Sequence, residues 1–249
     1  MSIEKKKIIQ SHFDNYSTSW HERFATHQFY ARFDYIKNTI NKLTKNTVVD
    51  IGCGTGDYSR IFSEDVDYTG VDISEKMIAR CIELHPNRKF LAQDIETTIA
   101  GNKKYDLVLD IGVIEYYEDP GLHMQQIKSL MASDGVLIIE APNSSNVTKK
   151  LNTNISKALK KILRNKKQNL NVKHQEVKHR EKSLRDFQSL AKEVDLSVFD
   201  YAYVACLFIP EVLPGIKPLN EWLSMKINGL RCFRFIAKYT ATTIVCCMK

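Results

Sequence analysis

A glycine-rich turn between an apolar strand and a helix is the strongest constraint that this sequence places on its fold. Residues 48–56 read VVDIGCGTG, so an apolar strand runs directly into the pattern G-x-G-x-G. Glycines at such a turn let the backbone bend sharply and let a ligand approach the main chain closely. Asp72 follows the first glycine by 20 residues, at the end of the next expected strand. Because a carboxylate there can accept hydrogen bonds from both hydroxyls of a ribose, the segment predicts a nucleoside site.

Acidic residues around this turn narrow the kind of nucleoside that it would bind. A phosphate at the turn would lie beside the negative charge of Asp50, two residues before the first glycine. The spacing also differs from the G-x-G-x-x-G of dinucleotide-binding proteins. A third acid, Asp94, ends the expected third strand. The acids therefore point away from NAD and ATP and toward S-adenosylmethionine, which is cationic at sulfur and carries no phosphate.

Short apolar runs alternate with helical patterns between residues 46 and 141. The expected strands are Thr47–Ile51, Tyr68–Val71, Lys89–Leu91, Tyr105–Asp110 and Gly135–Glu140. The expected helices are Asp57–Phe62, Ser74–Leu84, Ile95–Ala100 and Gly121–Ala132. Alternation at this spacing predicts an α/β fold with helices on both faces of a parallel sheet.

The segments on either side of this core have patterns of their own. Residues 3–43 read as helical and are dense in aromatic side chains. Ser183 with Asp186 is typical of a capping box that opens a helix, which we expect to end near Val194. Two late strands are expected at Leu196–Leu207 and Ala241–Met248.

Five segments together carry a family resemblance: VVDIGCGTG, TGVDISEKMI, FLAQDIE, YDLVLDIGVIEYY and LMASDGVLIIEAPN. They occur in family order over roughly residues 45–142, and the chain resembles the class I S-adenosylmethionine-dependent methyltransferases of the small-molecule branch. The resemblance implies a Rossmann-like seven-stranded sheet, mostly parallel with the last strand antiparallel. It also implies a helical N-terminal cap and helical insertions after strands 5 and 6. One domain is expected, divided into a cap at 1–44, a cofactor-binding core at 45–142, a basic helical insertion or lid at 143–182 and C-terminal strands at 183–249 with an apolar insertion at 208–235.

The resemblance also implies a set of cofactor-binding residues: Asp50, Gly52, Cys53, Gly54, Gly56, Asp72, Ile73, Met77, Asp94, Ile95, Asp110, Ile111 and Gly112. In this assignment the backbone near Gly52 and Gly54 holds the methionine part of the cofactor, and Asp50 orients that end. Residues 110–112, at the end of the fourth strand, border the sulfonium and the acceptor.

The other residues of the set are assigned to the nucleoside. Asp72 binds the ribose hydroxyls, and Ile73 and Met77 pack on the adenine. Asp94 accepts from the adenine amino group, and the backbone N–H of Ile95 donates to the ring. Two simpler interpretations stay open: Met77 packs in the core, and Asp94 caps the helix that starts at Ile95.

The reaction leaves the identity of any catalytic residue open. A sulfonium is an activated methyl donor, so placing the acceptor in line and excluding water does most of the work. A hydroxyl acceptor would benefit from a base, whereas an amine or a carboxylate would not need one. Many relatives carry an acid followed by His after the fourth strand, but here the segment reads Glu115-Tyr116-Tyr117. Tyr116 and His179 are the catalytic candidates, against a packed aromatic ring and a solvated loop histidine.

Aromatic residues of the N-terminal segment are candidates for a lid over the acceptor. Tyr16, Trp20 and His21 are the residues that we assign to it, although most aromatic rings of this segment should only pack. His123 lies on an expected helix and should face away from the site. No Cys/His set has the spacing of a zinc site and no C-x-x-C pair occurs, so no metal is expected.

The net charge of +7 belongs to one segment of the chain. Residues 149–182 hold 12 Lys/Arg and 2 Asp/Glu, a net +10, and the remaining 24 basic and 27 acidic residues give −3. Within this segment 151–164 is a basic amphipathic helix, which fits either a lid or peripheral contact with an anionic membrane. The charged first residues lack the apolar core of a signal peptide, and we expect a cytoplasmic protein.

Three functions follow from these observations. The first is methyl transfer to the hydroxyl, carboxyl or amine of a metabolite or lipid-linked intermediate. The second is an RNA or DNA methyltransferase that uses the basic segment. Against the second, DIGVIEYY lacks the Asn/Asp-Pro-Pro-aromatic pattern of base-amine methylation, and the sequence has no Pro-Cys pair. The third is a non-catalytic module that binds S-adenosylmethionine.

Overall fold

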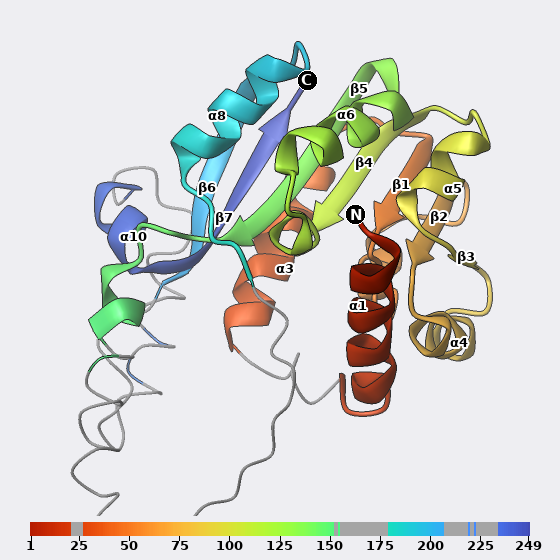
Figure 1. Cartoon of the computed structure of the whole chain (residues 1–249). Coiled ribbons are helices and arrows are strands. Elements are labelled where there is room, and N and C mark those ends of the chain that lie inside the picture. The colour runs from red at the N-terminus through yellow and green to blue at the C-terminus, as the bar shows by residue number, and fades with distance from the viewer. Residues whose placement is uncertain (21–26, 152–153, 155–178, 207–218, 220–221, 223–233) are drawn as a thin grey trace, which may run out of the picture.

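A single seven-stranded sheet organises the chain in the computed structural model (Figure 1). The structure describes residues 1–20, 27–151, 154, 179–206, 219, 222 and 234–249. The strands are β1 (Thr47–Ile51), β2 (Asp67–Asp72), β3 (Lys89–Ala92), β4 (Tyr105–Ile111), β5 (Met131–Pro142), β6 (Val198–Cys206) and β7 (Ala241–Met248). Their order in the sheet is β3-β2-β1-β4-β5-β7-β6. This is the predicted α/β Rossmann-like sheet.

Strand direction also follows the prediction. β1 to β5 pair in parallel, whereas β7 runs antiparallel to both of its neighbours, β5 and β6. The carboxyl ends of β1, β2, β3 and β4 therefore lie along one edge of the sheet. In open parallel sheets this edge, where the strand order reverses, is the place for ligands.

Helices cover both faces of the sheet, as Figure 1 shows for α6 and α8 in front and α3 behind. The helices are α1 (Ile3–Tyr16), α3 (His27–Ile40), α4 (Glu75–Leu84), α5 (Ile95–Ala100), α6 (Pro120–Leu130), α8 (Leu184–Glu193) and α10 (Arg234–Thr240). Two short 3-10 helices, η1 (Asp57–Ile61) and η2 (Ile114–Tyr116), follow β1 and β4. The predicted helical cap corresponds to α1 and α3.

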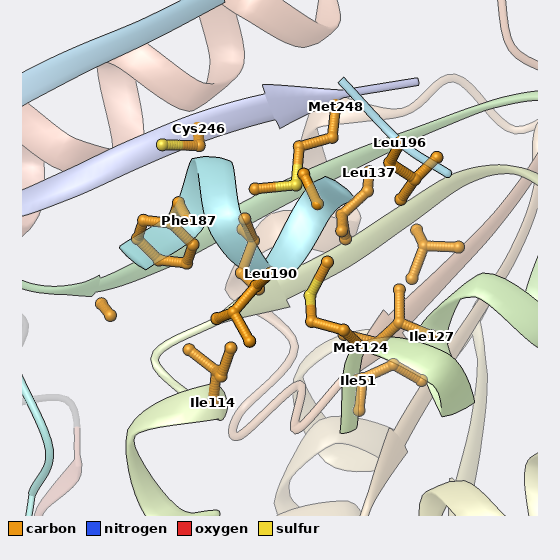
Figure 2. Packing of buried hydrophobic residues seen from close by; sticks show 14 of the residues in the cluster. Ile51, Ile114, Met124, Ile127, Leu137, Phe187, Leu190, Leu196, Cys246 and Met248 are labelled. Carbon is orange, nitrogen blue, oxygen red and sulfur yellow. The ribbon is translucent and has the colours of Figure 1, made fainter. Parts of the chain in front are cut away.

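The apolar runs of the strands supply two cores, one on each face. Val49 and Ile51 of β1 belong to the core under α5, α6 and α8, and Val48 belongs to the core under α3 and α4. Figure 2 shows the first core, where Phe187 of α8 and Met124 of α6 pack over the strands. Because successive residues of a strand point to opposite faces, a strand that is covered on both is largely apolar along its length.

Local sequence signals set the start of several helices. The side chains of Ser74, Asp94 and Asp119 each accept a hydrogen bond from a backbone N–H in the first turn of α4, α5 and α6. The capping box of Ser183 and Asp186 is confirmed at the start of α8. These caps fix where the helices leave the carboxyl edge of the sheet.

Two predicted segments lie largely outside the described residues. They are the basic helix 151–164 and the apolar insertion 208–235. The division of the chain at residues 44, 142 and 182 stays a prediction. Over the parts of the chain that are described, no helix has the length and apolar character needed to span a membrane.

Candidate functional site

A cavity of about 260 Å³ lies at the carboxyl edge of the sheet. Its walls come from the ends of β1, β2 and β4, from the residues after β3, and from α1 and α3. Lys6, Ile9 and Phe13 of α1 line it, so α1 covers the strand ends. Predicted residues in the lining are Asp50, Gly52, Cys53, Gly54, Asp72, Ile73, Asp94, Ile95, Ile111, Gly112, Tyr116 and Trp20. The structure thus gathers most of the predicted site in one place.

The glycine turn has the backbone that its sequence predicts. Gly52 and Gly54 have φ angles of 66° and 56°, in the left-handed region that side chains disfavour. A Cβ added at Gly52 would collide with Val113, and one at Gly54 would lie 3.3 Å from Nε1 of Trp20. The turn is held to β2 because the N–H groups of Gly52 and Cys53 donate to the carbonyl of Val71, at 2.8 and 3.0 Å. Neither glycine tolerates a side chain without movement of the cavity wall.

Asp50 and Asp72 are buried carboxyl groups with different partners. Oδ2 of Asp50 accepts from the hydroxyl of Tyr68 at 2.7 Å. Asp72 accepts from the backbone N–H groups of Gly54 and Ser74, at 3.0 and 2.8 Å. Burial raises the pKa of Asp50 to about 7, although the Tyr68 hydrogen bond opposes the shift. Burial raises the pKa of Asp72 to about 6, although the hydrogen bonds from its backbone donors lower it.

Asp94 caps α5, as its simpler interpretation predicts, and it also lines the cavity. Its Oδ1 accepts from the N–H of Thr97 at 2.9 Å. Its Oδ2 lies 2.7 Å from Nζ of Lys6, which also bonds Glu96. Burial opposes ionisation, but the hydrogen bonds from Lys6 and Thr97 lower the pKa of Asp94 to about 2. A charged residue of α1 therefore reaches the end of the cavity next to β3.

At the far end of the cavity, sequence reasoning missed an ion pair. NH1 of Arg32, on α3, lies 3.1 Å from Oε2 of Glu140, on β5, and Glu140 is almost fully buried. Burial raises the pKa of Glu140 to about 7, although Arg32 opposes the shift. One signal was available: Glu140 is the charged residue in the otherwise apolar run VLIIEAP, in a strand expected to be buried.

Glu115 is the second residue that the sequence did not single out. It lies on η2, lines the cavity and is 7% exposed. Nδ1 of His179 lies 3.2 Å from its Oε1, and the His179 ring packs 5.1 Å from that of Tyr116. The N–H of Arg180 donates to the carbonyl of Glu115 at 3.0 Å, which fixes this segment against η2. Both catalytic candidates therefore meet at Glu115, but only Tyr116 of the two lines the cavity.

His123 does not line the cavity, but it is buried directly behind the cavity wall. His123 is fully buried on α6, and its Nε2 lies 2.5 Å from Oδ2 of Asp110. Its ring stacks on Tyr117, which lines the cavity, with 3.7 Å between centroids. Oδ1 of Asp110 accepts from the N–H of Ile114 at 3.1 Å. Asp110 thus supports the loop after β4 from behind.

Other predicted residues lie outside the lining. These described residues are Gly56, Met77, Asp110, Tyr16 and His179. Met77 is fully buried in α4, as its simpler interpretation required, and Tyr16 packs on His12, with ring centroids 4.8 Å apart. His21 is outside the described residues. Among the residues that the structure describes, no group of three or more His, Cys, Asp or Glu is arranged to hold a metal ion.

Three features together define the class I S-adenosylmethionine-dependent methyltransferase fold: the order of the strands, the glycine turn after β1, and the acids at the ends of three successive strands. The chain belongs to the methyltransferase domain family, whose sequence profile matches residues 42–203. S-adenosylmethionine is the methyl donor of this family.

Individual relatives agree with this assignment. Malonyl-[acyl-carrier protein] O-methyltransferase of Acetivibrio thermocellus is 28% identical over 137 residues, which are 53% of this chain and 48% of that protein. The chain thus spans about half the length of the curated relatives it matches.

Solved structures share the fold. Magnesium protoporphyrin IX methyltransferase of Synechocystis, with bound SAH, has a TM-score of 0.61 at 16% identity, covering 98% of each chain. The 1,6-didemethyltoxoflavin-N1-methyltransferase of Burkholderia thailandensis has the same TM-score at 14% identity, covering 98% of this chain and 88% of that one.

Proposed function

We propose that this protein transfers the methyl group of S-adenosylmethionine to a small-molecule acceptor. The observation that carries the proposal is one covered cavity lined by the glycine turn together with Asp50, Asp72 and Asp94. These are the ends of three neighbouring strands, so the acids are spaced along the edge of the sheet where an extended nucleoside fits.

The residues present fit the cofactor. Asp72 would accept from the ribose hydroxyls, and Asp94 would face the adenine with the apolar side chains of Ile73 and Ile95. Glycine at positions 52 and 54, both in the cavity lining, would let the methionine part approach the main chain, because neither residue carries a side chain. When bound, the cofactor supplies a methyl group on a positively charged sulfur, which the acidic lining favours.

Enclosure favours a small acceptor. Aromatic and apolar side chains cover the cavity, with the rings of Phe13 and Tyr116 edge to face at 5.6 Å. A polyanion such as RNA is disfavoured inside it, since the lining includes five acidic residues and two basic ones. The hydroxyl, amine and carboxyl of a metabolite all stay within this proposal.

Calorimetry combined with product detection tests the proposal. We expect the protein to bind S-adenosylmethionine and to release a methylated product from a metabolite or lipid extract, measured by mass spectrometry. Binding without methyl transfer would favour a non-catalytic module. Failure to bind the cofactor would contradict both functions.

Exposed apolar residues favour membrane contact as a second candidate. Phe235, Ile236 and Tyr239 of α10 are exposed, as are Val147 and Leu151. The amides of Asn143 and Asn146 bond carbonyls of α10 and of Ala241, so these two segments are neighbours. Vesicle pelleting is the test: binding to phosphatidylglycerol but not phosphatidylcholine would support contact with an anionic lipid surface, and equal absence from both would exclude it.

A further inference from the structure

Glu115 presents an unsatisfied acceptor at the cavity. Its side chain is 9% exposed, and its Oε1 lies 3.2 Å from Nδ1 of His179. Within the described part of the chain, its Oε2 is buried and has no hydrogen-bond partner. A buried carboxylate oxygen without a donor is costly, and such groups in native proteins call for an explanation. A ligand that donates a hydrogen bond would satisfy it.

Arg32 presents the complementary group. It lines the same cavity and pairs through NH1 with Glu140, at 3.1 Å, while its Nε is buried and without a partner among the described residues. The cavity lining therefore contains an unsatisfied carboxylate acceptor and an unsatisfied guanidinium donor, and the buried hydroxyl of Tyr58, also in the lining, has no hydrogen-bond partner among the described residues. A hydroxyl is the simple group that donates and accepts at once and still keeps a lone pair for attack.

The positions and charges of Glu115 and Glu140 favour an uncharged methyl acceptor over an anionic one. A Cβ on Gly112, at the end of β4, would lie 3.9 Å from Oε1 of Glu115 and 3.5 Å from Oε2 of Glu140. Glu115 in the lining and Glu140 behind Gly112 therefore lie at the end of the cavity next to β4 and β5, away from Asp94. A carboxylate placed there would be a third negative group beside one guanidinium.

We propose that the acceptor is a hydroxyl on an aromatic or otherwise apolar body, and that Glu115 is the catalytic residue that takes its proton. This inference rests on the proposed function. A lone pair of the acceptor oxygen forms the new carbon–oxygen bond. The carbon–sulfur bond breaks with its electron pair moving to sulfur, which leaves S-adenosylhomocysteine. The hydroxyl proton goes to Oε2 of Glu115, so atoms and charge balance.

Methyl-labelled cofactor identifies the methylated atom. Wild-type protein is incubated with tritium-labelled S-adenosylmethionine and a metabolite extract, and the labelled product is treated with mild alkali. We expect an ether, which retains the label. Release of labelled methanol, which indicates an ester, or a mass-spectrometric fragment with an N-methyl group overturns the inference and leaves the proposed function standing.

Glu115→Gln keeps the size of the side chain and removes its charge. We expect its affinity for S-adenosylhomocysteine to stay within ~2-fold and its rate of methyl transfer to fall by ~10²-fold or more. Glu118→Gln is the matched control, because Glu118 is three residues further on and 69% exposed. Its rate should equal that of the wild type. A Glu115→Gln variant at the wild-type rate overturns the inference, and a wild type that binds cofactor but forms no product overturns the proposed function and this inference with it.

Discussion

The two ends of the cavity are built in different ways. At the β1–β3 end, the acids accept hydrogen bonds mainly from the motif segments themselves: Asp72 from the N–H groups of Gly54 and Ser74, and Asp94 from Thr97, with Lys6 of α1 as a distant partner. At the β4–β5 end, the partners are far apart in sequence, as in Arg32 with Glu140, separated by 108 residues. One end is largely a local property of the chain and the other exists only once the fold has formed.

This difference has an energetic consequence. Backbone N–H groups at the β1–β3 end persist whatever side chains are changed, so a substitution there removes one interaction. At the β4–β5 end, the buried carboxylate of Glu140 depends on the guanidinium of Arg32, and loss of that cation leaves it uncompensated. We therefore expect substitutions at the first end to reduce binding and those at the second to reduce stability.

The largest effect should come from Arg32→Met. It leaves Glu140, 1% exposed, without its cation, and the free energy of unfolding at pH 8 should fall by about 3–5 kcal/mol. Chemical denaturation of the full chain measures it. Arg80→Met is the control, since Arg80 and Glu83 form an exposed pair whose loss should cost less than about 1 kcal/mol.

The same variant has a signed pH dependence. Burial holds the pKa of Glu140 near 7 in the folded protein, above its ordinary 4.5, and loss of Arg32 removes the group that opposes this shift. An acid with a raised folded pKa binds protons more tightly when folded, so its penalty grows as pH rises and shrinks as pH falls. The stability loss of Arg32→Met should therefore be smaller at pH 6 than at pH 8. An equal loss at both values would show that Glu140 is not the group left uncompensated.

Asp72→Asn tests the other end. The variant keeps the shape of the side chain but loses the charge that would face the ribose, and hydrogen bonds to charged groups contribute about 1.5–3 kcal/mol. We expect the affinity for S-adenosylhomocysteine to fall by ~10- to 100-fold in calorimetry while the protein still folds. Asp67→Asn at the opposite end of β2, 55% exposed, should bind as the wild type does. Unchanged affinity in Asp72→Asn would remove the ribose assignment.

Sequence reasoning was reliable where local pattern decides structure. The glycine turn, the strand Ala241–Met248, the helix Ile95–Ala100 and the capping box at Ser183 all occur where the residues predicted them. Each depends on backbone conformation, strand alternation or a cap, which act over a few residues.

The β4–β5 end of the cavity was harder to predict from the sequence, because its residues are brought together only by the fold. Glu115 was passed over in favour of its neighbour Tyr116, and Arg32 is one basic residue in an aromatic segment. The burial of His123 could have been predicted from helical spacing. It lies four residues before Ile127 and seven before Leu130, on the buried face of α6. A polar residue at an inward position is the feature to seek.

Lys6→Met should have the smallest effect on stability, and it tests the contrast between the two ends of the cavity. Lys6 bonds Asp94 and Glu96 at the β1–β3 end, but all three side chains are 20–38% exposed, so the loss of unfolding free energy should stay below about 1 kcal/mol. The lowered pKa of Asp94, about 2 against an ordinary 3.8, makes this contribution complete at neutral pH and lost only as pH falls toward 2.

Salt concentration distinguishes the partly exposed pair of Lys6 and Asp94 from the buried pair of Arg32 and Glu140. Partly exposed charges are screened as ionic strength rises, because the Debye length falls from roughly 14 to 4 Å between 0.05 and 0.5 M salt. The difference in unfolding free energy between Lys6→Met and the wild type should therefore shrink over this range. The corresponding difference for Arg32→Met should change little. Denaturation at both concentrations measures it. A Lys6→Met loss as large and as insensitive to salt as that of Arg32→Met would mean that a buried ion pair stabilises each end of the cavity, and the contrast between the two ends would then be wrong.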